Sequence, residues 1–438
     1  MKRLITLSTL TVLLASLLLS GCIQDKCKQD ITYFAYIPQY VSYEDLRASV
    51  ASEAPHDLKT PGKMYFKDGF IFISEINRGI HVINNTDPNN PENVAFINIP
   101  GNHDLAIKGN VLYADSYIDL VTIDISDPTN ATEMSRDLDV FPYGWNHEGL
   151  WADPDSGIAI DWLEKEITEE IECQNSGWNI MPLNTFTRQE AILFADLSSN
   201  STLAPTAAGT GSGSEISVGV GGSLARFTIV NDYLYAVTWT DLKVFQITDL
   251  TDPQDIRDIS VGWDIETIFP HNNRLFLGAQ SGMHVYSLED PSSPSKLSDF
   301  QHVRSCDPVV VEGDYAYVTL RSGTECQGFT DQLEVINISN IFNPVLEHTY
   351  PMFNPHGLGI RNNTLFICDG DEGLKVYDAS DVSKIADNQL AHFENIKALD
   401  VIPLHSILLM ISEDGLYQYD YSNLQDIRQI SVIPVVTE

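Results

Sequence analysis

Apolar and polar residues alternate in short runs along most of this chain, and turn-forming residues close each run. One phrase of this kind recurs eight times, clearly at 79–84, 120–125, 242–247, 283–288, 333–338 and 374–378 and more weakly at 191–196 and 416–420. An alternation with a period of two predicts a half-buried β-strand, and a following pair such as Asp127-Pro128 ends it. Each phrase therefore predicts one short strand.

Each clear phrase belongs to a larger unit, because a two-residue turn and another strand precede it. The turn pairs are rich in Gly, Asn and Asp, which supply the positive φ that tight hairpins need. They are Gly109-Asn110, Asn231-Asp232, Asn272-Asn273, Gly313-Asp314 and Asn362-Asn363. One strand leads into each turn and another follows the proline, so the unit is four antiparallel strands. Such units, repeated every 40–45 residues or so, are typical of β-propeller blades. We predict an all-β propeller of eight blades, with seven as the alternative count.

The phrase also resembles a known repeat. The segment 120–128, Leu-Val-Thr-Ile-Asp-Ile-Ser-Asp-Pro, resembles the LVIVD repeat, which occurs in exported and surface proteins of bacteria and archaea. The resemblance covers roughly residues 60–433 and implies a β-propeller. It implies no activity, because the repeat has no general assigned function and propellers include both binding proteins and enzymes.

The beginning of the chain is typical of an exported lipoprotein. Lys2 and Arg3 precede an apolar run over 4–19 that is too short for a membrane-spanning helix. Leu19-Ser20-Gly21-Cys22 then resembles the lipobox of bacterial lipoproteins. We therefore expect cleavage before Cys22 and a membrane anchor through acyl chains, such as palmitate, on that cysteine.

The same features predict a location and a domain organisation. Ile23 stands where an aspartate would favour retention in the inner membrane, so we expect the outer membrane of the cell envelope. The chain divides into a signal peptide (1–21), a lipid-anchored tether and N-terminal segment (22–59) and the propeller (60–438).

The charge of the chain excludes one class of partner. The 438 residues include 25 Lys and Arg against 61 Asp and Glu, which gives a formal net charge of −36. Loss of Lys2 and Arg3 with the signal makes it 23 − 61 = −38. A phosphate backbone repels so acidic a chain, and no basic stripe offsets the charge, so nucleic acid is excluded.

Candidate binding residues follow from the expected topology. The starts of the innermost strands should meet at one mouth of the central channel, a concave place that suits ligands. In six consecutive units an ionisable residue falls at this position. Strand starts are exposed and attract polar residues in any case, so the pattern is compatible with ordinary solvation as well as with a binding site. These lip residues are His103, Asp104, His147, Glu148, Arg226, Glu266, Asp307 and His356.

Two kinds of chemistry could use the lip residues. Imidazoles and carboxylates suit zinc or another divalent ion, provided that the blades bring them within bonding distance. The donors would be His103, His147 and His356 with Asp104, Glu148 or Glu266. Alternatively, Glu148 and Asp307 could act as acid and base on a glycan, which would make the protein a hydrolase or lyase.

Binding without chemistry needs only a shaped surface with a polar rim. We therefore expect a binding or scaffold module of the cell envelope that needs no cofactor, with a protein or glycan partner at the channel mouth. The hydrolase or lyase remains the alternative.

We expect two insertions and a pair of cysteines to lie at the same channel mouth. Segments 163–190 and 322–332 lengthen turns of the third and sixth units, and insertions on one face often build binding surfaces. Cys306 and Cys326 lie at the mouth of the sixth unit and predict a disulfide in an oxidising compartment, whereas Cys368 ends an apolar strand and predicts a buried side chain. We interpret the glutamates of the first insertion as a solvated short helix: Glu164, Glu166, Glu169, Glu170 and Glu172.

Overall fold

The computed structural model describes residues 28–48, 50–141, 152–153, 155–172, 217–302, 308–323 and 330–436. These residues form β-strands almost throughout, which confirms the all-β prediction. The chain divides into two compact units. The first comprises 1–40 and 159–201, of which 28–40 and 159–172 are described, and the second comprises 41–158 and 202–438.

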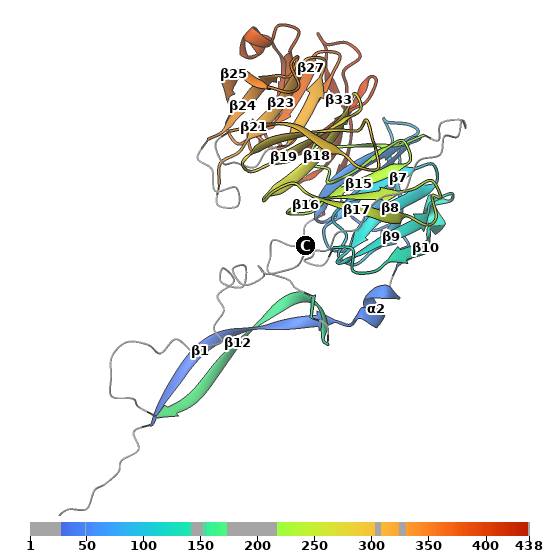
Figure 1. Ribbon diagram of the computed structural model, residues 1–438, viewed down its shortest axis with the longest axis vertical. Coiled ribbons are helices and arrows are strands. Elements are labelled where there is room, and N and C mark those ends of the chain that lie inside the picture. The colour runs from blue at the N-terminus through green and yellow to red at the C-terminus, as the bar shows by residue number, and fades with distance from the viewer. Residues whose placement is uncertain are drawn as a thin grey trace, which may run out of the picture. The chain divides into compact units, whose positions relative to one another are not determined.

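Seven sheets of the second unit each contain four consecutive antiparallel strands, which form the blades of a propeller (Figure 1). The first three blades are β3 (Pro61–Lys67), β4 (Phe70–Glu75), β5 (Gly79–Asn84) and β6 (Glu92–Asn98); β7 (Leu105–Lys108), β8 (Val111–Ser116), β9 (Asp119–Asp124) and β10 (Thr132–Asp137); and β14 (Phe227–Val230), β15 (Tyr233–Val237), β16 (Asp241–Gln246) and β17 (Gln254–Ser260).

The other four blades follow without interruption by another sheet. They are β18 (Ile265–His271), β19 (Arg274–Ala279), β20 (Gly282–Ser287) and β21 (Ser295–Gln301); β22 (Val309–Glu312), β23 (Tyr315–Leu320), β24 (Gln332–Asn337) and β25 (Val345–Pro351); β26 (Leu358–Arg361), β27 (Thr364–Cys368), β28 (Leu374–Asp378) and β29 (Gln389–Phe393); and β30 (Ala398–Pro403), β31 (Ile407–Ser412), β32 (Gly415–Asp420) and β33 (Arg428–Pro434).

The first strand of each blade lies at the centre of a closed ring. β3 contacts β7, β7 contacts β14, and the series continues through β18, β22, β26 and β30 back to β3. Where the first blade meets the seventh, the amides of Asn85 and Gln418 exchange hydrogen bonds of 3.0 and 2.7 Å. Seven, the lower of the two predicted counts, is thus the number of blades that the described residues form. The copy of the phrase at 191–196 lies outside them.

The turn chemistry of the sequence explains the hairpins. Gly109, Asn231, Asn272, Gly313 and Asn362 all have positive φ, between 47° and 61°, as the predicted turns require. In every blade the pairing of the third and fourth strands also shifts register once. Such bulges bend and twist the outermost strand.

Apolar side chains on both faces of the blades fill the space between neighbours. Phe276 and Val285 of the fourth blade, for example, pack with Val309 of the fifth, and all three are fully buried. The middle strands are therefore apolar nearly throughout, while the outer strands alternate. Cys368 lies buried at the end of β27, as predicted, and burial raises the pKa of its thiol.

The described part of the glutamate-rich insertion, residues 163–172, is a strand, so the interpretation of its glutamates as a short helix is wrong. β12 (Gly157–Glu172) pairs with β1 (Lys28–Val41) on one side and with β11 (Ala152–Asp153) on the other. Ile158, Ile160 and Trp162 recur with the period of two that a strand needs. The hydroxyls of Thr32 and Thr168 lie 2.9 Å apart across the β1–β12 pair. Exposed strands of a two-stranded ribbon leave glutamate side chains in water as readily as a helix does.

Short elements complete the second unit. Helix α2 (Tyr43–Arg47) is capped by the hydroxyl of Ser42, which accepts a hydrogen bond from the backbone of Asp45. Strands β2 (Ala51–Glu53) and β13 (Val220–Gly221) extend the first blade at its outer and inner edges, and the 3₁₀ helices η1 (Pro128–Asn130) and η3 (Val382–Asp387) precede the fourth strands of two blades. Among the described residues, no helix has the length and apolar character needed to cross a membrane.

Candidate functional site

Five of the eight lip residues are described, and all five lie at the starts of inner strands. His103 and Asp104 precede β7, and Arg226 precedes β14. Glu266 is the second residue of β18, and His356 precedes β26. His147, Glu148 and Asp307 lie outside the described residues, as do Cys22, Cys306 and Cys326.

Asp104 joins the first three blades through one buried carboxylate. Its Oδ2 accepts a 2.9 Å hydrogen bond from Nζ of Lys63 in the first blade and further bonds from the backbone N–H groups of Arg226 and Phe227 in the third. Burial lowers the pKa of Lys63, and the charge of Asp104 acts in the opposite direction. The carboxylate of Asp104 therefore has a structural role, because its hydrogen bonds connect the second blade to the first and the third.

A second carboxylate supports the first from β8. Oδ1 of Asp115 accepts hydrogen bonds of 2.8 and 2.9 Å from the backbone N–H groups of His103 and Asp104. Burial raises the pKa of Asp115 to about 7, although these N–H groups oppose the shift. The side chain thus fixes the loop that leads into β7.

The residues that precede β14 pack against the inner strands of the ring. We call residues 217–224 the channel segment. Val220 pairs with Phe66 on the inner edge of β3, and the backbone N–H groups of Gly109 and Gly219 donate to Ser217 and Ile107 at 2.9 and 3.0 Å. The segment therefore lies along the inner strands of the first two blades, near the ends of β3 and β7.

The other end of the channel segment is bonded to the sixth and seventh blades. Ser223 donates a 2.8 Å hydrogen bond from its hydroxyl to Oδ1 of Asp400 and accepts one of 2.9 Å from the backbone of Leu358. Burial raises the pKa of Asp400 to about 6, opposed by its hydrogen bonds from Ser223 and neighbouring backbone groups. The segment thus connects the first and second blades to the sixth and seventh.

The remaining lip residues are also engaged with neighbours. Nε2 of His103 lies 2.8 Å from Oδ1 of Asn77, and Oε1 of Glu266 accepts a 2.9 Å hydrogen bond from Gln280. Burial and the guanidinium of Arg321 lower the pKa of His356 to about 4, so this imidazole is neutral at neutral pH. These contacts position the loops at the inner strands.

The metal-ligating side chains that come together are different from those predicted. Among the described residues, the group of histidine, cysteine and acidic side chains close enough to share an ion is His56, Glu75 and His81. His103 and His356 are not part of it. His56 lies in the segment that the sequence indicated as a tether, which offers no pattern to single it out.

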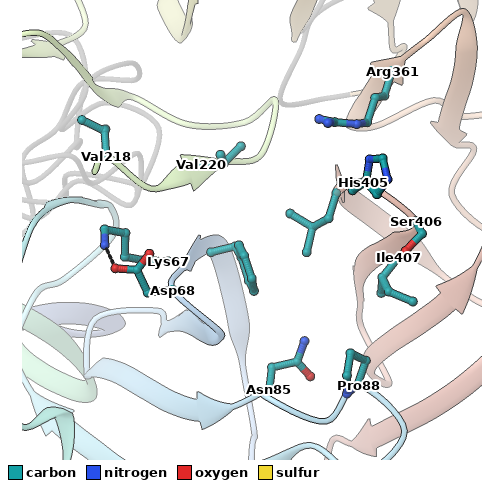
Figure 2. Close-up of a pocket in the computed structure, with 12 residues that line it drawn as sticks. Lys67, Asp68, Asn85, Pro88, Val218, Val220, Arg361, His405, Ser406 and Ile407 are labelled. Carbon is teal, nitrogen blue, oxygen red and sulfur yellow. Dashed lines mark hydrogen bonds and ion pairs between the residues drawn. The ribbon is translucent and has the colours of Figure 1, made fainter. Parts of the chain in front are cut away.

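A pocket of about 420 Å³ lies at the opposite end of the channel, where inner strands β3, β26 and β30 end (Figure 2). Arg361 and His405 lie close together on one side, and Val218 and Val220 of the channel segment lie on the other (Figure 2). Nζ of Lys67 forms an ion pair with its neighbour Asp68 at the rim. Arg361 directly precedes the predicted turn Asn362-Asn363, which was the one sequence signal near this pocket.

Comparison with known families identifies the repeat. Residues 102–138, which span the second blade, and residues 304–351, which span the fifth, match the LVIVD repeat family. The chain contains LVIVD repeats. The phrase that gives the repeat its name forms the third strand of each blade, and comparison with curated proteins gives no match.

Solved structures with a similar fold include other repeat proteins. The computationally designed Ika8 protein is 11% identical, with 88% of this chain and 91% of that chain covered and a TM-score of 0.49. A functionally unknown protein from Desulfotomaculum acetoxidans is 12% identical, with 84% and 95% covered and a TM-score of 0.48. Sqt1 from Saccharomyces cerevisiae is 9% identical, with 92% and 88% covered and a TM-score of 0.46. At these values the likenesses say nothing about ligand or activity.

Proposed function

We propose that this LVIVD-repeat propeller is a binding module of the bacterial cell envelope, and that its ligand presents a carboxylate on an apolar body. The pocket at the ends of β3, β26 and β30 supports this function, since its volume of about 420 Å³ falls in the range of small-ligand sites. Phe66, Val220 and Ile407 supply apolar walls. A carboxylate of this kind occurs at the end of a protein chain and on acidic sugars, which are the two expected partner classes.

The observation that carries the proposal is that Arg361 and His405 both line one side of this pocket in a chain of net charge −36. Arg361 is exposed, and its side chain makes no hydrogen bond or ion pair with other residues of the described part. A guanidinium offers a fork of N–H donors that matches a carboxylate. Acidic residues dominate elsewhere, so a cationic pocket is a specific feature of this position.

The test is a calorimetric titration of the protein with two matched pairs of probes. One pair is a short apolar peptide with a free or an amidated C-terminus, and the other is a uronic acid disaccharide or its neutral analogue. We expect one acidic probe to bind, and Arg361→Ala to weaken it about 10–100-fold, since a charge-assisted hydrogen bond contributes about 1.5–3 kcal/mol.

The control is Lys384→Ala, which removes an exposed cation whose side chain lies outside the pocket. This variant should bind as the wild type does. Equal binding of acidic and neutral probes, or an affinity indifferent to Arg361→Ala, would contradict the proposal.

The attachment to the envelope rests on the sequence alone. We infer an acyl anchor on Cys22 because residues 19–22 resemble a lipobox. Mass spectrometry of the membrane fraction should find a chain that begins at acylated Cys22, and Cys22→Ala should abolish the modification. On a density gradient, the wild type should sediment with the outer membrane and Ile23→Asp with the inner membrane; wild-type protein in the inner membrane would overturn the assigned location.

A further inference from the structure

The residues that precede the first blade contact both this blade and the seventh, where the ring of blades closes. β2 pairs with β6 at the outer edge of this blade, and Leu58 forms a parallel bridge with Val435 beyond the last strand of the seventh. The backbone N–H of Val436 donates a 2.9 Å hydrogen bond to Leu58. The short stretch between β2 and Leu58, which contains His56, therefore connects the first blade to the seventh.

His56 lies against a histidine and a glutamate of the first blade. His81 on β5 pairs with Ile73 on β4, and Glu75 stands two residues further along β4. Side chains two residues apart share one face of a strand, so Glu75 and His81 project from the same face. One ligand atom from each of His56, Glu75 and His81 lies within 4.8 Å of the others.

The hydrogen bonds of His56 occupy one ring nitrogen and leave the other without a partner. Nδ1 of His56 lies 3.0 Å from the carbonyl oxygen of Asp57 and must donate its proton there. In the neutral imidazole, Nε2 of the same ring is then the nitrogen with the free lone pair. Nε2 is buried and has no hydrogen-bond partner among the described residues. Buried polar atoms without a partner are rare because they lose their hydration without compensation.

The other two donors share one proton. Nε2 of His81 lies 2.7 Å from Oε2 of Glu75, and the guanidinium of Arg78 donates to Oε1 of the same carboxylate. A divalent cation placed between Glu75 and His81 would replace that shared proton. The proton would then move from Nε2 to Nδ1 of His81, which lies 3.2 Å from Nδ2 of Asn93. Oδ1 of Asn93, also buried without a partner in the described part, could accept a hydrogen bond from that Nδ1–H after rotation of the amide.

A related pair in another blade shows what His56 adds. His284 is the third residue of β20, as His81 is of β5, and it pairs with Asp299 at 2.5 Å. Lys243, the third residue of β16, likewise pairs with Asp258, so a basic side chain beside a carboxylate recurs at this position. The carboxylates of Asp299 and Asp258 come from the fourth strands of their blades, whereas Glu75 comes from the second. Only around His81 does a third donor join the pair within the described residues.

We propose that His56, Glu75 and His81 bind a divalent transition-metal ion of the zinc class, which fastens the N-terminal segment across the closure of the ring. Two imidazole nitrogens and one carboxylate oxygen form a common zinc ligand set, and water can supply a fourth ligand. The carbonyl of Asp57 accepts a hydrogen bond from the other nitrogen of His56, as backbone carbonyls do for metal-binding histidines in known sites. Ligands about 2.0–2.2 Å from zinc lie within roughly 4 Å of one another, so small side-chain rotations complete the site.

The test uses the full-length protein, purified in detergent and stripped of metal with a chelator. Titration with Zn²⁺ should reveal one tight site per chain and a rise in the melting temperature, and Co²⁺ should give the visible absorption of a tetrahedral site. We expect His56→Ala to weaken Zn²⁺ binding by about 100-fold, because one of three protein ligands is lost. His284→Ala, which removes the equivalent histidine of the fourth blade, should leave binding unchanged.

A second variant guards against misfolding of the first. Glu75→Gln preserves the shape of the side chain and its contact with Arg78 but loses the anionic ligand, so it should also lose the tight site and the Co²⁺ spectrum. Absence of a tight site in the wild type, or a site that survives both His56→Ala and Glu75→Gln, would overturn the proposal. The outcome is independent of the carboxylate-binding pocket, which lies at Arg361.

Discussion

The hydroxyl of Ser223 donates a 2.8 Å hydrogen bond to Oδ1 of Asp400 and accepts a 2.9 Å bond from the backbone N–H of Leu358. One buried side chain of the channel segment thus satisfies groups on both the sixth and the seventh blade. Because the same segment pairs with β3 of the first blade, it acts as an internal brace of the ring. The pocket to which we assign ligand binding lies at one end of the channel, where this segment and the ends of three inner strands line it.

Removal of this hydroxyl should measure the strength of the brace. Ser223→Ala leaves the N–H of Leu358 without its acceptor and removes one of the donors to Oδ1 of Asp400, which keeps the backbone N–H groups of Ser223 and Val401. We therefore expect a loss of about 1.5–3 kcal/mol in the free energy of unfolding. Guanidinium denaturation gives the value. Ser422→Ala serves as the control, because that hydroxyl donates a 2.6 Å bond to Asp420 in an exposed turn, and its loss should cost about 0.5 kcal/mol or less. Equal effects of the two substitutions would mean that the brace contributes nothing.

The buried carboxylate of Asp400 should leave a signature in the pH dependence of stability. Burial raises its pKa to about 6 from an ordinary value of 3.8, so between these values the folded protein retains a proton that the unfolded chain has lost. The contribution of this group to stability therefore falls as pH rises from about 4 to about 6, by up to roughly 1.4 kcal/mol per unit of pKa shift. Asp400→Asn should remove this fall. Parallel melting curves of the wild type and the variant across that pH range would refute it.

The blades could be predicted from the sequence because the information that defines them is local. A period of two and a turn pair such as Asn362-Asn363 fix a hairpin within a dozen or so residues. The networks of the lip could not be predicted in this way. Asp104 bonds to Lys63, 41 residues away, and to Arg226, 122 residues away, and one sequence gives no sign that these residues meet. The positions of the lip residues could therefore be predicted from the sequence. Their hydrogen bonds and ion pairs to distant residues could not.

The sequence of the channel segment contains a clearer sign of its environment, namely three closely spaced glycines. Gly219, Gly221 and Gly222 lie within four residues of one another, and glycines in a strand often mark a close approach of another chain element. The structure confirms this cause, since a Cβ on Gly222 would lie 2.0 Å from Oδ2 of Asp400. The site at His56, by contrast, depends on one residue in a segment without periodicity.

The close approach at Gly222 can be tested against its neighbour. A Cβ on Gly221 would lie 3.3 Å from the nearest atoms, those of Ala225 and Tyr65, so slight adjustments accommodate it. Gly222→Ala must displace the Asp400 carboxylate, and we expect a cost of about 1–3 kcal/mol, as for other overpacked sites. Gly221→Ala should lower the melting temperature much less. A reversed order would show that Asp400 moves freely and does not hold the segment.

The ion pair between Lys63 and Asp104 should be strongly coupled, because both charges lie in the interior of the ring. Nζ of Lys63 is 2.9 Å from Oδ2 of Asp104, whose side chain is 3% exposed. Lys63→Met leaves the carboxylate buried without its countercharge, which should cost about 3–5 kcal/mol, whereas adding Asp104→Asn should recover part of that loss. The double-mutant cycle of the exposed pair Lys397 and Glu413 gives the reference, with an expected coupling of about 0–1 kcal/mol. If the two cycles gave the same coupling energy, Asp104 would be held by its backbone donors alone, and the link between the first and second blades would not depend on charge.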